Sequence, residues 1–252
     1  MLVVSAAWLA AGCASNPNRD PRDPLEPYNR AMFRFNNDLD RAFIRPLAQG
    51  YKAVVPEPVD RGVTNFFRNI DDVTSFVNNI LQFKMSRAGS DLGRIFMNST
   101  VGILGFFDVA TNAGLPSYKE DFGQTLGYWG LEPGAYFVLP FFGPSTMRDN
   151  IGFAGDLVTD PFFSIEQDKI YWGFVGLRIV DTRADRLAVG DILQDAAVDP
   201  YVFIRDAYLQ RRENLVYDGN PPEADSQGDI WADVDFGTPS GSPPKAPPKA
   251  AP

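Results

Sequence analysis

Ile95–Phe107, which reads IFMNSTVGILGFF, is the first of three glycine-containing apolar segments that decide how this chain folds. Phe122–Gly130 (FGQTLGYWG) and Val138–Pro144 (VLPFFGP) follow it after a polar turn. The first run carries no charge between Arg94 and Asp108, yet it is shorter than the roughly 20 residues that a helix needs to cross a bilayer core. It predicts either a buried helical core or short helices that dip part of the way into lipid.

The amino terminus favours the lipid alternative. Residues 1–12 are apolar and end in the small residues Ala-Ala-Gly directly before Cys13. This layout is typical of a signal peptide that is removed from the mature protein, and it resembles the signal of bacterial lipoproteins, whose first mature residue is an acylated cysteine. Because Cys13 is the only cysteine of the chain, a free thiol in a frayed end is the alternative. We predict that Cys13 is the lipid attachment site and that residues 13–22 form a polar tether.

Composition and charge restrict the classes of partner. With 252 residues, of which 44% are hydrophobic, the chain can bury the core of one domain. Its net charge of −9 repels phosphate polyanions, so we expect no nucleic-acid partner. The same charge cannot hold the chain on an anionic bilayer, because that attraction requires clustered lysine and arginine. Attachment to a membrane therefore has to come from acyl chains and apolar surface.

The absence of histidine removes most catalytic and metal sites from consideration. Without an imidazole there is no Ser-His-Asp or Cys-His catalysis and no histidine-ligated zinc. Neither a glycine-rich phosphate loop nor an EF-hand loop is present in the sequence. A glycosidase-like pair of carboxylates stays open, since spacing in sequence does not show whether two of them face each other. We predict that the protein is not an enzyme and has no catalytic residues, no metal site and no cofactor.

A first amphipathic helix is predicted over residues 23–45. Its apolar residues recur at steps of three and four. Pro46 is expected to end the helix, because the residue before a proline disfavours the helical region. Asn36 and Asn37 interrupt the apolar face with side chains that compete for backbone hydrogen bonds. We therefore predict a bend at Asn36 and Asn37, which are the candidate hinge controlling access to a path.

The clearest helix of the sequence is predicted over Val59–Gln82. Its apolar residues fall within an arc of about 140° at 100° per residue. The opposite side is weakly charged and rich in Asn, Ser and Gln, whereas a solvent-exposed face usually carries more Lys and Glu. We expect that side to face a water-filled cavity or another helix, with plain solvent exposure as the alternative. The candidate channel-facing polar residues are Asn65, Asn69, Ser75, Asn79 and Gln82.

Two pairs of phenylalanines are the candidate membrane-facing residues. Phe106 and Phe107 end the first apolar run, and Phe141 and Phe142 lie at the centre of the third. Burying a few such side chains in lipid contributes several kcal/mol at about 25 cal/mol per Å² of apolar area. We therefore expect the folded body to stay on the membrane even without its acyl chains.

Helix starts and the tail are indicated by local chemistry. Thr146 and Asp149 form a capping box for a helix that runs to about residue 158. Asp199-Pro200 places an N-cap and a first-turn proline before another helix. Residues 218–252 are rich in Pro, Asp and Ser and cannot bury enough apolar area to fold, so we predict a disordered tail.

Four separated motifs, in this order, resemble the VacJ/MlaA family of outer-membrane lipoproteins. They are DPLEPYNR at 23–30, FGQTLG at 122–127, VLPFFGP at 138–144 with the Arg-Asp pair that follows it, and DPYVFIRDAYLQRR at 199–212. The resemblance covers about residues 23 to 215. Each motif alone is weak, but four in one order make the resemblance specific.

This resemblance implies an all-α fold, a ring-like assembly of short amphipathic helices lying in one leaflet of a membrane, here over residues 23–217. It implies that mislocalised phospholipids leave the outer leaflet through a central amphipathic channel and pass to a soluble periplasmic lipid carrier. This is intermembrane phospholipid transport, which maintains lipid asymmetry. The expected partners are phospholipid, the membrane, a trimeric porin and the carrier.

The same resemblance implies a location in the outer membrane, facing the periplasm and held by an acyl (palmitate) anchor. Two alternatives from other classes stay open. One is an envelope scaffold lipoprotein that transports nothing, and the other is a carboxylate-dependent cell-wall hydrolase. Phospholipid bound to the extracted protein separates transport from both.

Overall fold

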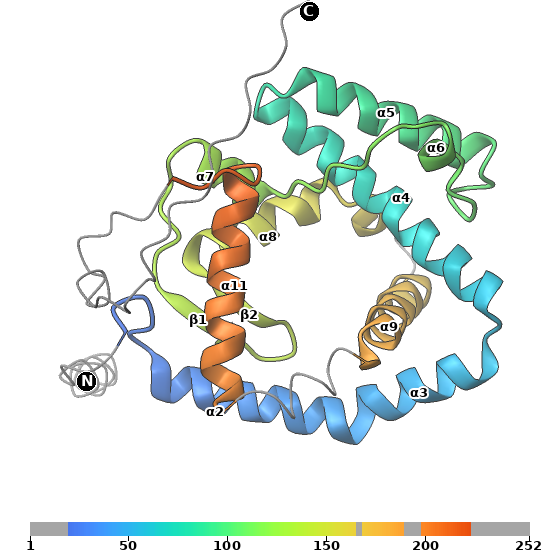
Figure 1. Cartoon of the computed structure of the whole chain (residues 1–252). Coiled ribbons are helices and arrows are strands. Elements are labelled where there is room, and N and C mark those ends of the chain that lie inside the picture. Colours follow the sequence, from blue (N-terminus) through green and yellow to red (C-terminus); the bar gives the residue numbers. More distant parts are fainter. Residues whose placement is uncertain (1–19, 165–167, 189–197, 223–252) are drawn as a thin grey trace, which may run out of the picture.

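A computed structural model describes residues 20–164, 168–188 and 198–222 (Figure 1). The predicted signal peptide, Cys13 and the part of the predicted tail beyond residue 222 lie outside these residues. Within them the chain is predominantly helical, and its strands form a single two-stranded antiparallel sheet. The all-α prediction is therefore confirmed, with this small sheet as an addition to it.

The first part of the described chain, residues 26–100, curves round to form most of a ring (Figure 1). Residues 26–54 run along the lower edge of the ring in this view, and the longest helix, residues 57–81, continues along its right and upper side. The next helix, residues 85–100, runs back beside it. These elements are α2 (Glu26–Leu39), the π-helical turn (Asp40–Ile44), α3 (Arg45–Val54), α4 (Glu57–Leu81) and α5 (Met85–Thr100).

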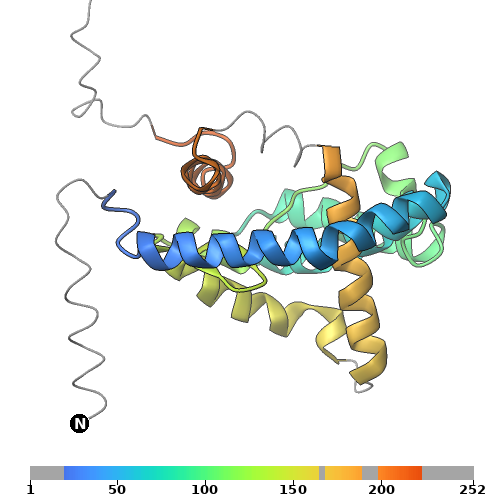
Figure 2. The ribbon, with the colours of Figure 1, turned by 90° about the horizontal axis from the view of Figure 1, so that it is seen from below.

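The other elements close the ring and cross it. The two strands pair in register, with Tyr136 opposite Thr146 and Leu139 opposite Gly143. Figure 2 shows the ring edge-on: α9 runs across its plane, and α11 lies to one side of it. These elements are α6 (Val109–Asn112), α7 (Phe122–Tyr128), β1 (Tyr136–Leu139), β2 (Gly143–Thr146), α8 (Met147–Thr159), a 3₁₀ turn (Pro161–Ser164), α9 (Asp168–Asp185) and α11 (Pro200–Val216).

The prediction that Pro46 ends the first helix is wrong. The backbone stays in the helical region through Ile44 and Arg45, and α3 follows without a break. The π-helical turn allows this, because the amide of Arg45 donates to the carbonyl of Asp40, five residues back. Pro46 then lies in the first turn of α3. A proline is tolerated there because amides of the first turn have no carbonyl partner within their own helix.

The predictions for three other helices agree closely with the structure. The helix predicted over Val59–Gln82 is α4. The hydroxyl of Thr146 accepts a hydrogen bond from the amide of Asp149 over 3.2 Å and caps α8. Asp199 caps α11 in the same way, accepting from the amide of Tyr201 over 3.0 Å.

The compact apolar core is small and lies where the hairpin meets α2 and α11. Tyr136 and Val138 of β1 are almost fully buried against Tyr201 of α11, and Met32 and Phe33 of α2 pack on this group. A core of this size leaves most apolar side chains of the described chain without a buried position.

Packing in the ring is inverted relative to an ordinary soluble domain. Among the described residues, buried polar and charged side chains outnumber buried apolar ones. In α4, Ile80 and Leu81 on the apolar side are exposed, whereas Asp72, Ser75 and Asn79 on the polar side are buried. Soluble domains normally do the reverse. We call the exposed large apolar side chains of the described residues the apolar perimeter, and side chains exposed in such number indicate a surface for another apolar phase or partner. None of the described helices is both long and apolar enough to span a bilayer.

Candidate functional site

The polar side of α4 is engaged by hydrogen bonds to neighbouring segments. Asn69 donates to the hydroxyl of Ser99 over 2.9 Å, and Asn79 donates to the carboxylate of Asp91 over 2.7 Å. Both partners belong to α5, so this polar seam joins two helices of the ring. Asn79 and Asp91 are completely buried.

Two further candidates on α4 face the segment before α7. The hydroxyl of Ser75 accepts from the amide of Glu120 over 3.2 Å. The Nε2 group of Gln82 donates to the Glu120 carboxylate and to the hydroxyl of Thr125, each over 3.0 Å. Of the two expectations for this face, packing against another element accounts for these contacts. A role in lining a channel stays a prediction for them.

The sequence predicted that Phe106 faces the membrane, but in the structure it does not face outward. It is half-buried and lies on Gly62 of α4, where an added Cβ would come within 2.2 Å of its ring. The backbone oxygen of Phe106 also accepts from Asn65, the remaining candidate on α4, over 3.4 Å. Its neighbour Phe107 is exposed, so one member of this pair packs on the ring and the other points away from it.

The apolar run that contains this pair is closed by the two charges that flank it in sequence. Arg94 is almost fully buried, and its guanidinium contacts Asp72 at 3.0 Å and Asp108 at 3.4 Å. This pairing draws the ends of the run together, so that residues 101–107 form a turn with Ile103 and Leu104 exposed. A charge at each end anchors an apolar turn that has little buried surface of its own.

Asn36 holds the tip of the hairpin and does not form a bend. Its side chain donates to the carbonyl of Leu139 and accepts from the amide of Phe141, both over 2.8 Å. Phe141 has a φ of 68°, a left-handed conformation that costs a non-glycine residue free energy, and this pair of bonds offsets that cost. The helix is regular at Asn36 and Asn37, and the irregular turn begins later, at Asp40. The predicted position of the bend is therefore wrong, while a gating role for these two residues stays a prediction.

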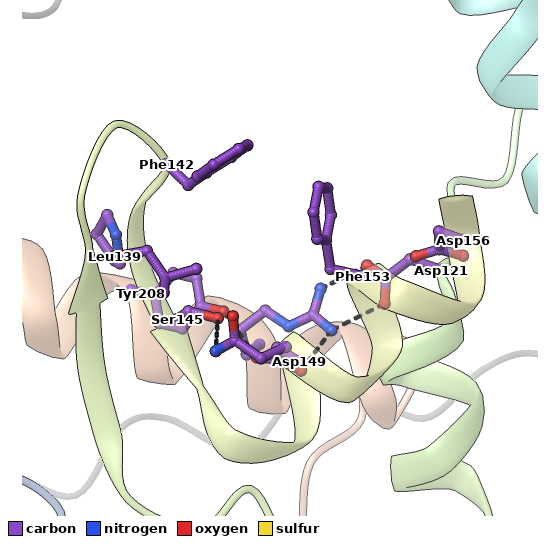
Figure 3. Close-up of a pocket in the computed structure, with 11 residues that line it drawn as sticks. Asp121, Leu139, Phe142, Ser145, Asp149, Phe153, Asp156 and Tyr208 are labelled. Atoms are coloured by element: carbon purple, nitrogen blue, oxygen red, sulfur yellow. Dashed lines mark hydrogen bonds and ion pairs between the residues drawn. The ribbon is translucent and has the colours of Figure 1, made fainter. Parts of the chain in front are cut away.

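A pocket of about 300 Å³ lies between the hairpin, α8, α11 and the start of α7 (Figure 3). One part of its wall is apolar, with the rings of Phe142 and Phe153 5.5 Å apart. The other part is polar and charged. The full lining is Asp121, Leu139, Phe142, Pro144, Ser145, Asp149, Asn150, Phe153, Asp156, Tyr208 and Arg212.

Arg212 pairs with two of the three carboxylates in this pocket. Its guanidinium contacts Asp121 at 2.5 Å and 2.9 Å and Asp149 at 2.8 Å. Burial opposes the charge of Arg212, but the bonds to Asp121 outweigh it and raise the pKa of the guanidinium. Burial likewise opposes the charge of Asp121, and the bond from Arg212 holds the pKa of that carboxyl below its usual value.

Asp156, the third carboxylate, is held by neutral groups. Its Oδ1 accepts from the amide of Phe122 over 2.9 Å and from the side chain of Asn78 over 3.2 Å. Burial raises the pKa of Asp156 to about 6, and the nearby charge of Asp121 adds to the shift. The pocket thus combines an apolar wall with a carboxylate that lacks a full counter-charge.

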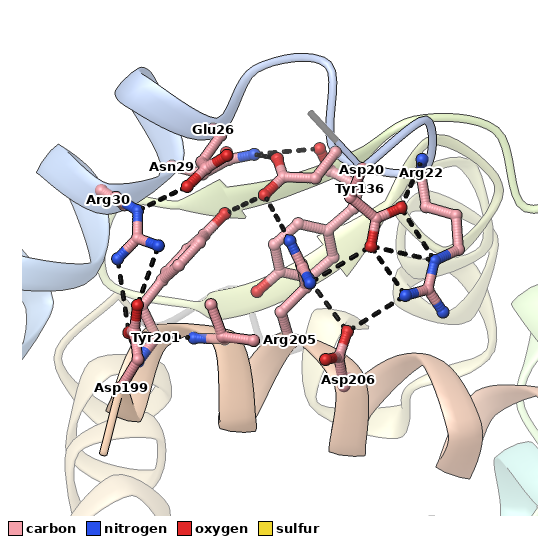
Figure 4. A network of polar contacts seen from close by, with 12 residues as sticks. Asp20, Arg22, Glu26, Asn29, Arg30, Tyr136, Asp199, Tyr201, Arg205 and Asp206 are labelled. Atoms are coloured by element: carbon pink, nitrogen blue, oxygen red, sulfur yellow. Dashed lines mark hydrogen bonds and ion pairs between the residues drawn. The ribbon is translucent and has the colours of Figure 1, made fainter. Parts of the chain in front are cut away.

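A second polar cluster fastens α11 to the start of the chain (Figure 4). Asp23 has no exposed surface, and its carboxylate accepts from Asn29 over 2.7 Å, from the hydroxyl of Tyr201 and from Arg205 over 3.3 Å. Asn29 also binds the backbone of β1, accepting from the amide of Val138 over 2.8 Å. We call Asp23, Asn29, Tyr201 and Arg205 the clasp, because they join α2, β1 and α11.

Sequence reasoning missed both the pocket and the clasp. Partial signals were present, since the capping box contains Asp149, and Asp23, Arg205 and Arg212 lie inside the family-like motifs. The sequence does not show which charged residues pair with each other, because partners such as Arg212 and Asp121 are 91 residues apart. The described residues contain no group of three or more His, Cys, Asp or Glu that could hold a metal ion.

Comparisons with known proteins agree with this architecture. The family model described as MlaA lipoprotein matches residues 21–215. The intermembrane phospholipid transport system lipoprotein MlaA of Escherichia coli is 34% identical over 241 residues, 90% of this chain and 94% of that protein. Its namesake in Haemophilus influenzae is 32% identical over 242 residues, 91% of this chain and 96% of that protein.

A solved structure extends the similarity to the fold. It comes from work on the structural basis for maintenance of bacterial outer-membrane lipid asymmetry and matches with a TM-score of 0.70 at 34% identity. The match covers 79% of this chain and 100% of that chain. With the family model spanning most of its length, this chain belongs to the MlaA lipoprotein family.

Proposed function

We propose that this chain is an outer-membrane lipoprotein that removes mislocalised phospholipids from the outer leaflet and passes them to a soluble periplasmic carrier. One observation carries the proposal: among the described residues many large apolar side chains are exposed, whereas polar and charged side chains are buried. The perimeter lies in the acyl region of the inner leaflet, and the interior gives the headgroup a polar path. Such a path is needed because burying a charged group in hydrocarbon is costly.

The parts of the chain divide this work. Cys13 carries the acyl anchor, residues 13–22 act as the tether, and residues 23–217 form the ring. A trimeric porin holds the ring in the outer membrane. With no nucleotide-binding loop in the sequence, direction comes from downhill flow or from the partner.

Lipid extraction tests the proposal directly. The acylated protein is purified in mild detergent, and bound lipid is extracted and quantified by mass spectrometry. We expect phospholipid at about the molar amount of protein, and a null strain should regain normal outer-leaflet phospholipid when it expresses the chain. Protein without bound phospholipid contradicts transport and leaves the scaffold alternative; cleavage of cell-wall glycan by the purified protein supports the hydrolase.

Membrane contact of the perimeter is tested with a non-acylated version that carries an ordinary export signal. Phe141 and Phe142 are each 69% exposed. Replacing both by Ser should weaken binding to phospholipid vesicles by about 2–4 kcal/mol, roughly 30-fold or more, whereas replacing both by Leu should change it little. Equal vesicle binding by the Ser and Leu variants would show that this hairpin tip is not in lipid.

A further inference from the structure

The pocket between the hairpin and α8 has two unlike walls that meet at a carboxylate. Phe142 and Phe153 are both exposed, so the apolar wall continues into the outer perimeter. Figure 3 shows the two rings on the same side of the pocket, with Asp149 below them and Asp156 to the right of Phe153. A volume of about 300 Å³ is at the small end for a ligand pocket. The pocket is large enough for a headgroup but not for a whole lipid, so the acyl chains would leave it beside the side chains of Phe142 and Phe153.

The charge of the lining favours a cation over an anion. Three carboxylates line the pocket and are balanced by two guanidiniums, that of Arg212 in the lining and that of Arg148, which contacts Asp149 at 3.3 Å, so one negative charge is left in excess. Arg212 is committed to Asp121 and Asp149, so it offers little to an incoming phosphate. Asp156 receives hydrogen bonds from neutral donors alone, which makes it the carboxylate that gains most from a positive partner.

We propose that this pocket selects phospholipids with an ammonium headgroup, and that Asp156 receives the ammonium. The proposal rests on the transport function above and adds a substrate class to it. A zwitterionic lipid with a primary ammonium brings a donor to Asp156, whereas an anionic lipid such as phosphatidylglycerol brings no cation and meets the excess negative charge. The acyl chains lie along Phe142 and Phe153 toward the surrounding membrane.

A competition experiment measures this selectivity. Detergent-purified, acylated protein is equilibrated with equal amounts of phosphatidylethanolamine and phosphatidylglycerol that have the same acyl chains, and the bound lipids are counted by mass spectrometry. The wild type should enrich phosphatidylethanolamine on the order of tenfold, the size of one charge-assisted hydrogen bond. Asp156→Asn should bring the bound ratio back to the input ratio.

The control is Asp185→Asn, which removes a carboxylate of α9 that pairs with Lys52 at 3.6 Å and does not line the pocket. It should keep the enrichment. Lowering the pH below about 6 should reduce the enrichment of the wild type, because Asp156 gains a proton while Asp121 and Arg212 keep their charges. This pH measurement uses the wild type alone, so it tests the proposal even if Asp156→Asn fails to fold.

The outcomes separate this inference from the transport function. Phospholipid bound in the input ratio by the wild type, or enrichment that survives Asp156→Asn, overturns the selectivity while transport stands. Absence of any bound phospholipid overturns both. Enrichment that is lost in Asp156→Asn and kept in Asp185→Asn supports the assignment.

Discussion

Asp23 is a buried carboxylate whose partners set the stability of α11. Tyr201→Phe removes one donor of the clasp and keeps the volume of the ring, which leaves Asp23 a partner short where no water reaches it. A hydrogen bond to a charged group contributes about 1.5–3 kcal/mol, so the free energy of unfolding should fall by about 2 kcal/mol. Arg205→Leu removes the cation and should cost more, about 3–5 kcal/mol, because the buried charge loses its compensation.

Tyr217→Phe is the matched control at the other end of the same helix. Tyr217 is 48% exposed, so loss of its hydroxyl should change stability by less than about 0.5 kcal/mol. Thermal unfolding in detergent gives the order of the three variants. Hydrogen exchange of the α11 amides then shows whether the helix opens locally before the rest of the ring, as loss of the clasp predicts.

A double-mutant cycle isolates the contact between Tyr201 and Asp23. If the clasp is cooperative, Asp23→Asn should abolish most of the extra cost of Tyr201→Phe. Equal stability of Tyr201→Phe and Tyr217→Phe would refute the reasoning, since it would mean that the buried carboxylate does not depend on that hydroxyl.

Three further predictions follow from particular residues. Burial raises the pKa of Asp91 from 3.8 to about 7, so the folded state holds this proton more tightly than the unfolded chain does. The wild type should therefore lose stability as the pH rises from 3.8 to about 7. Thermal unfolding at several pH values should show that Asp91→Asn removes roughly 4 kcal/mol of this pH dependence of stability. Gly152→Ala should lower the melting temperature, because its Cβ would meet the Gly123 backbone at 2.3 Å, while Gly50→Ala, with open space around it, should raise the melting temperature slightly. Cys13→Ala should abolish palmitate labelling, and labelling that persists contradicts the anchor assignment.

Local chemistry explains which elements were predictable. The period of α4 and the caps at Thr146 and Asp199 depend on residues that are close in sequence, so their structure follows from the sequence itself. Pro46 was read by the same local rule and the result was wrong, because a π-helical turn shifted the hydrogen bonds before it. Such a turn has no clear sequence signal.

The periodicity of a helix predicts that it has two faces, but not which one is inside. In α4 the apolar residues Ile80 and Leu81 are exposed, although Phe67 is buried, and Asp72, Ser75 and Asn79 on the polar side are buried. The sequence shows that the two faces differ but not which residues pack inward. The weakly charged polar side was the available clue, since solvent-facing helices normally carry Lys and Glu. The pocket was less accessible still, because its charges come from α7, α8 and α11 and meet only in the folded ring.

Inversion also changes what holds the ring together. In lipid, an apolar perimeter contributes little to the association of helices, since acyl chains are as apolar as the side chains they surround. The ring then depends on polar contacts and on close backbone approach. Both are present: Arg94 bonds Asp72 where α5 meets α4, and α8 lies so close to α7 that a Cβ added to Gly152 would come within 2.3 Å of the Gly123 backbone. Removing a buried polar partner should therefore damage this protein more than trimming one of its large apolar side chains, most of which are not buried. In a soluble helical domain the large apolar side chains form the core, and trimming them is among the most costly changes.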